Sequence, residues 1–154
     1  DPTLAISWFR LAAAQGKAQS QFFLAMLLNK QGQAEESQAW LRKAAAQNYA
    51  SAETMLGSQL LATGKADDRK EAIVLLDKAA AQDERMAQVA LAECYEKGLG
   101  VPQDYAHAAT LYQRAASANN RNALIGLARL YDNGQGVPKD AAKAEQLRSK
   151  AISL

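Results

Sequence analysis

A repeat with a nearly fixed period is the feature that most constrains how this chain can fold. A bulky apolar residue stands four positions before a stretch of small residues five times along the 154 residues. These residues are Trp8, Trp40, Leu75, Leu111 and Leu147, and the intervals between them are 32, 35, 36 and 36 residues. Periods of about 20–50 residues are typical of stacked units that cannot bury their apolar faces alone. The spacing therefore predicts a solenoid rather than a domain with one closed core.

Further columns of residues keep the same phase. Sixteen residues after each of the first four bulky positions comes a leucine followed by a small residue. The pairs are Leu24-Ala25, Leu56-Gly57, Leu91-Ala92 and Leu127-Ala128. All variation in length falls between these pairs and the next bulky residue, so we expect that connection to be a surface loop. The connection from the bulky column to the leucine pair is expected to be geometrically fixed.

Each unit is predicted to be a pair of helices. The first, which we call the A helix, carries small residues and leucine at helical spacing, as in Ala87 and Leu91, and the second, the B helix, does so in Leu111 and Ala115. Gly98 and Gly134 fit the left-handed ends of A helices. The aspartates placed to cap B helices are Asp1, Asp68, Asp104 and Asp140. Trp8 and Trp40 are expected to pack in the core.

The register divides the chain into one solenoid with a leading B helix. The expected units are 1–16 for that helix, and 17–48, 49–83, 84–119 and 120–154 for four A/B pairs. Because the leading helix has no A helix before it, we expect the chain to be a segment of a longer stack. Many of its 34 alanines fall in the fixed columns, where neighbouring helices must touch.

Composition excludes several classes of protein. The net charge of +2 offers no basic surplus for nucleic acid. The longest apolar run, residues 22–28, is far shorter than the about 20 residues that span a membrane. His107 is the only histidine and Cys94 the only cysteine, so no metal-ligand spacing, disulfide framework or nucleophile–base pair is visible. The sequence predicts a non-enzyme with no cofactor and no metal.

The last two units carry the most specific pattern, Leu127-Ala128-x-x-Tyr131-x-x-Gly134-x-Gly136-Val137-x-x-Asp140 and its counterpart from Leu91. This pattern resembles Sel1-like repeats, which are relatives of tetratricopeptide repeats. The resemblance implies an all-α, right-handed α/α superhelical solenoid that serves as a scaffold for proteins or peptides, with no catalytic residues. It also favours a bacterial protein of the cell envelope or periplasm, or a secreted one, over a cytoplasmic one. The first two units lack the Gly-x-Gly-Val-Pro turn, which leaves their loop shape open.

The resemblance points to the A helices as the lining of the concave face. Three rows then run across them, five residues before, two before and two after each leucine. The rows are Gln19, Ser51, Met86 and Asn122; Phe22, Thr54, Val89 and Ile125; and Met26, Ser58, Glu93 and Arg129. Apolar anchors with polar neighbours are typical of a groove for an extended or helical peptide.

Alternatives to this interpretation stay open. Val89 and Ile125 could equally be core residues, Phe22 or Phe23 is expected to contact a partner or a further repeat, and Glu93 could pair with Arg129 between repeats. The main hypothesis is a non-catalytic scaffold that binds a protein or peptide partner. The alternatives are a structural or oligomerisation spacer, and a small-molecule or saccharide-binding module of the bacterial envelope.

Overall fold

The computed structural model describes residues 2–154, and all the regular structure in that range is helical. The predicted cap Asp1 lies outside the described residues. The helices are α1 (Pro2–Ala14), α2 (Ala18–Lys30), α3 (Ala34–Ala45), α4 (Ala50–Ala62), α5 (Ala66–Ala81), α6 (Arg85–Lys97), α7 (Tyr105–Ser117), α8 (Arg121–Asn133) and α9 (Ala141–Ile152).

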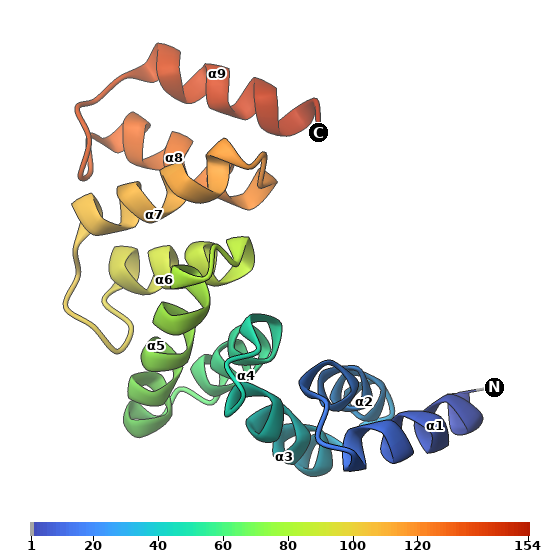
Figure 1. Ribbon diagram of the computed structural model, residues 1–154. Coiled ribbons are helices and arrows are strands. Elements are labelled where there is room, and N and C mark those ends of the chain that lie inside the picture. The colour runs from blue at the N-terminus through green and yellow to red at the C-terminus, as the bar shows by residue number, and fades with distance from the viewer. Residues whose placement is uncertain (1) are drawn as a thin grey trace.

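The helices form a curved stack in which each packs chiefly on the helix before it and the helix after it. Figure 1 shows the stack bending between α1 and α9, with the two termini at opposite ends and with α2 and α4 on the inner side of the bend. The A helices of the sequence pattern are α2, α4, α6 and α8, and the B helices are α1, α3, α5, α7 and α9. The predicted solenoid of helix pairs is confirmed.

Small residues line the contacts between neighbouring helices. Ala25, Ala92 and Ala128, from the column after the leucine, are at most 1% exposed. A Cβ atom added at Gly57 in the same column would lie 2.9 Å from Cγ of Leu76. Because interiors are close-packed, a larger side chain in this column would force neighbouring helices apart.

The bulky column of the B helices is buried to different extents, from 4% exposed at Leu111 to 71% at Trp8, which corrects the prediction that Trp8 packs in the core. Trp8 is 71% exposed, because the described chain places no helix on that side of α1. Trp40 is half-buried and packs against the core as predicted, and it donates from Nε1 to Glu36 and carries Lys43 Nζ 4.0 Å from its ring centroid. In α3, α5 and α7 the next residue along the helix is at most 1% exposed, at Leu41, Leu76 and Tyr112.

The predicted caps are confirmed in the last two loops and wrong in one earlier loop. Asp104 and Asp140 each accept a hydrogen bond from the backbone three residues on, at 2.9 Å. Gly98 and Gly134 end α6 and α8 in the left-handed conformation. Asp68, however, lies inside the first turn of α5, because this helix begins three residues earlier than predicted. Its carboxylate accepts a hydrogen bond from the hydroxyl of Thr63 and does not cap the helix.

The turns from B to A helices use a residue with positive φ that the sequence analysis did not identify. Asn48, Asp83 and Asn119 have φ of 58°, 61° and 59°, and Gly16 takes the same place with 83°. Asn, Asp and Gly tolerate the left-handed region better than other residues. Their constant register explains why this connection never changes length.

The second glycine of each Gly-x-Gly loop joins successive units. A Cβ atom added at Gly100 would lie 3.1 Å from the carbonyl oxygen of Arg69, and one at Gly136 only 2.2 Å from that of Tyr105. Both carbonyls lie in the first turn of the B helix of the preceding unit. The loops after α6 and α8 therefore dock, backbone against backbone, on the preceding unit.

Replacing Gly136 by alanine should destabilise the protein more than the same change at Gly16. Both glycines have positive φ, so both variants pay about 1–2 kcal/mol for a left-handed residue. No atom lies within 4 Å of a Cβ at Gly16, whereas Gly136→Ala must also displace backbone, which adds about 1–3 kcal/mol. Urea unfolding measures both, and equal losses would contradict the close contact at Gly136.

Candidate partner-binding surface

The two residues considered for catalysis are His107, which packs against another ring, and Cys94, which is buried. His107 is exposed on α7, and its ring centroid lies 4.1 Å from that of Tyr95. Burial raises the pKa of the Cys94 thiol to about 11, and a thiol that stays protonated is a poor nucleophile. Among the described residues, no three His, Cys, Asp or Glu side chains are placed to hold a metal ion. No helix of residues 2–154 is long and apolar enough to cross a membrane.

One buried carboxylate is unexpected. Glu53 on α4 is fully buried; its Oε2 accepts from Gln82 at 3.1 Å, and its Oε1 has no hydrogen-bond partner. Burial raises the pKa of this carboxyl, against the opposing influence of Lys78 and Gln82. Gln21 and Gln88 stand at the same register and donate to backbone carbonyls of the preceding B helix. Glu53 therefore occupies a packing position in which glutamine donates to the preceding helix, whereas one oxygen of the carboxylate is left without a partner.

The three predicted rows differ in how far they reach the surface. α8 presents its three members, at i, i+3 and i+7, as one exposed stripe. Over all four A helices, the exposed members are Gln19, Ser58, Met86, Asn122, Ile125 and Arg129, and the half-buried ones are Phe22, Met26, Ser51, Thr54 and Glu93. The remaining member is Val89.

Val89 and Ile125 occupy the same register and have different surroundings. Val89 is 4% exposed and belongs to the apolar core around α6, where α6 contacts α4 directly. Ile125 on α8 is 46% exposed. The prediction that Val89 contacts a partner is therefore wrong, because it packs inside the stack, while Ile125 remains accessible.

The neighbouring phenylalanines divide in the same way. The ring centroid of Phe22 lies 5.4 Å from that of Tyr49, and Phe22 packs against the core between α3 and α4. Phe23 is 38% exposed, and its ring lies 5.8 Å from that of Phe9 on α1. Phe23, which the rows omit, is the more accessible of the two.

Arg129 pairs with Glu96, and not with Glu93, which the sequence offered as one open alternative. Its guanidinium donates twice to the carboxylate of Glu96 on α6, at 2.8 and 2.7 Å, and the hydroxyl of Tyr112 donates to the same carboxylate at 2.8 Å. Glu93 lies 3.6 Å from Lys97, one turn along its own helix. The planar guanidinium of an arginine binds a carboxylate most strongly when it donates to both oxygens, and Glu96 presents both of its oxygens to Arg129.

This network fixes α6 and α8 relative to each other. Burial acts to raise the pKa of Glu96, but the hydrogen bonds from Arg129 and Tyr112 outweigh it and lower the pKa below the usual value. Burial and the bond to Glu96 raise the pKa of Tyr112, so the hydroxyl stays a donor. Two of the exposed row residues, Ile125 and Arg129, are thereby held on a rigid helix pair.

The comparisons with known proteins agree with the repeat pattern. The model of the Sel1 repeat matches residues 1–17, 18–49, 50–84, 85–120 and 121–154. Two similar solved structures are a protective antigen of uropathogenic Escherichia coli that displays an SLR fold (28% identity, TM-score 0.88) and a Sel1 repeat protein from Oxalobacter formigenes (30% identity, TM-score 0.88). They match 99% and 97% of this chain, which spans 37% and 64% of their lengths. None of the curated proteins matches the sequence significantly.

Replacing Glu53 by glutamine should stabilise the protein at neutral pH. A carboxyl whose folded pKa is raised contributes most to stability below its unfolded pKa, near 4.5, and the contribution is lost as the pH rises. Glutamine does not titrate and can donate a hydrogen bond as Gln21 and Gln88 do. We expect Glu53→Gln to gain about 1–3 kcal/mol at pH 7 and progressively less toward pH 4.

Urea unfolding between pH 4 and pH 8 measures this difference. The control is Glu35→Gln at an exposed position of α3, which should change stability by less than about 0.5 kcal/mol throughout. A destabilised Glu53→Gln variant, or a gain that does not depend on pH, would show that Glu53 is satisfied in the folded protein.

Proposed function

We propose that this chain, which belongs to the Sel1 repeat family, is a non-catalytic interaction module that binds a protein or peptide on the rows of its A helices. Sel1 repeat proteins generally mediate protein–protein interactions and are typically non-catalytic scaffolds. The proposal is narrower, because it names the surface. From here on, "A-helix rows" means the eleven accessible members of the three rows, without Val89, together with Phe23.

The observation that carries the proposal is the exposure of large apolar side chains on helices whose other faces are buried. Met86 is 52% exposed on α6, Ile125 46% on α8 and Phe23 38% on α2. Each has exposed polar residues close by along its own helix, such as Gln19 and Asn122. Scattered apolar anchors with a polar surround are typical of peptide-binding surfaces, in which a few anchors provide most of the affinity.

The rigidity of the surface supports the same function. Arg129 and Glu96 tie α8 to α6, and α4 contacts α6 directly, so the anchors keep fixed separations. A preorganised surface loses less entropy on binding than a mobile one. A peptide crossing these helices would therefore meet Met86 and Ile125 in a constant geometry.

A second candidate function is self-association through α1. Leu4, Trp8 and Leu11 are 61%, 71% and 63% exposed, at helical spacing. The internal helix α3 carries Glu36 and Lys43 at the registers of Leu4 and Leu11. Native mass measured over a range of concentrations separates the two candidates, since an apolar face of this kind would give dimers that disappear in Trp8→Glu.

Selection of peptides from a displayed library tests the A-helix rows directly. Peptides selected on the wild-type chain should bind Met86→Ser/Ile125→Ser at least about tenfold more weakly, because two exposed anchors are lost. Fluorescence anisotropy with the labelled peptides measures the affinities, and circular dichroism checks that the variant keeps its helices.

The matched control is Val74→Ser. Val74 is 56% exposed on the B helix α5, so the substitution also removes an exposed apolar side chain, but outside the A-helix rows. Selected peptides should bind it like the wild type. Peptides that lose affinity for Val74→Ser and not for the double variant would place the binding surface on the B helices and refute the proposal.

A further inference from the structure

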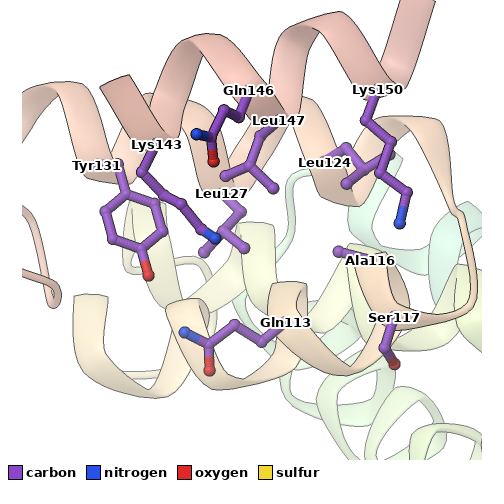
Figure 2. A pocket seen from close by; sticks show the side chains of 10 residues that line it. All are labelled: Gln113, Ala116, Ser117, Leu124, Leu127, Tyr131, Lys143, Gln146, Leu147 and Lys150. Carbon is purple, nitrogen blue, oxygen red and sulfur yellow. The ribbon is translucent and has the colours of Figure 1, made fainter. Parts of the chain in front are cut away.

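A separate groove lies between the B helices α7 and α9, with α8 as its floor. Its volume is about 420 Å³. Leu124 and Leu127 beneath it are only 1% and 4% exposed, so its accessible apolar lining is formed by Tyr131 on α8 and Leu147 on α9, both half-buried. Figure 2 shows Lys143 and Lys150 extending from α9 over this floor toward α7. None of the residues that line it belongs to the A-helix rows.

At the other end of the solenoid, ion pairs bridge the two equivalent grooves, between α1 and α3 and between α3 and α5. Arg10 on α1 pairs with Glu36 on α3, and Arg42 on α3 pairs with Glu71 on α5. Each pair joins one B helix to the next across the A helix between them. The two pairs occupy the same registers, so they form a repeated brace between consecutive B helices.

The third groove lies between α5 and α7, with α6 as its floor, and different residues occupy it. His107 replaces the glutamate of the brace, and its ring packs against Tyr95 on the floor. Arg114, on the same wall, is paired with Asp83 at 2.9 Å. Asp83 thus neutralises Arg114, which stands at the register of Lys150 in the last groove.

The fourth groove, between α7 and α9, lacks the brace and carries two cations. Gln113 stands at the register of Arg10 and Arg42, and Lys143 at that of Glu36 and Glu71. Within residues 2–154, no acidic side chain pairs with Lys143 or with Lys150, and no acidic residue lines the groove. Two positive charges without an acidic partner therefore lie beside the half-buried apolar side chains of Tyr131 and Leu147.

We propose that this groove binds an acidic, leucine-containing segment of a partner protein in extended conformation. Lys143 and Lys150 are two helical turns apart, about 10 Å along the axis of α9. Side chains on one face of an extended chain recur every two residues, about 7 Å, so the flexible lysine side chains can meet two carboxylates of that face. The intervening leucines point the other way, toward Tyr131 and Leu147. The acidic segment supplies the charge that glutamate supplies in the first two grooves.

The probe is a fluorescein-labelled ten-residue peptide in which glutamate and leucine alternate. It should bind the chain at micromolar concentration in 50 mM NaCl and at least about fivefold more weakly in 300 mM NaCl, because exposed charges are screened. A peptide of alternating lysine and leucine is the control for charge, and it should not bind.

Two variants locate the site. Lys143→Gln/Lys150→Gln should reduce the affinity for the glutamate–leucine peptide at least about tenfold. Gln113→Arg/Lys143→Glu rebuilds the brace of the first two grooves, and it should abolish binding without loss of thermal stability. Lys30→Gln, at an exposed lysine of α2, is the matched control and should bind like the wild type.

Ile125→Ser separates this site from the A-helix rows and should leave the affinity for this peptide unchanged. Binding that is lost in Ile125→Ser, or kept in the rebuilt brace, would overturn the proposal, as would absence of binding to the wild type at millimolar peptide. Equal binding of anionic phosphatidylglycerol vesicles, abolished by the same two variants, would assign the groove to a lipid surface and also overturn it.

Discussion

Close contact between neighbouring helices through alanine and glycine is the constraint on which the rest of the structure depends. Because side chains such as Ala25, Gly57, Ala92 and Ala128 are small, one helix can lie directly on the next. Each helix then packs chiefly on its two neighbours, and the chain grows as a stack with no common centre. The backbone contact of Gly136 with Tyr105 adds a second attachment between successive units.

This mode of packing decides where binding surfaces can form. One side of every A helix packs within the stack, so only the other side is accessible to a partner. This accessible stripe is clearest on α8. Arg129, which stands in that stripe, is held by Glu96, so it braces the surface while staying partly accessible. Between the B helices α7 and α9, where the ion pair of the first two grooves is missing, the stack leaves an open groove beside Lys143.

The periodic spacing was enough to predict the helix pairs and the caps at Asp104 and Asp140. It could not separate Val89 from Ile125, because their burial depends on which helices lie beside them and not on their own register. Nor could spacing show that Arg129 reaches Glu96 rather than Glu93, since that depends on side-chain direction across two helices. Trp8 was misjudged because its column is buried only where a helix packs on it. The unpaired oxygen of Glu53 has no signal in a single sequence beyond the glutamines at its register.

The most direct measurement of where partners bind is site-specific photo-crosslinking in cells that make the full-length protein. The photoreactive residue benzoylphenylalanine replaces either Ile125, on the A-helix rows, or Val74, an exposed residue of the B helix α5. Binding on the A-helix rows predicts a discrete crosslinked protein from position 125 and none from position 74. The same crosslinked product from both positions, or one from position 74 alone, would contradict the assignment of the A-helix rows as the binding surface.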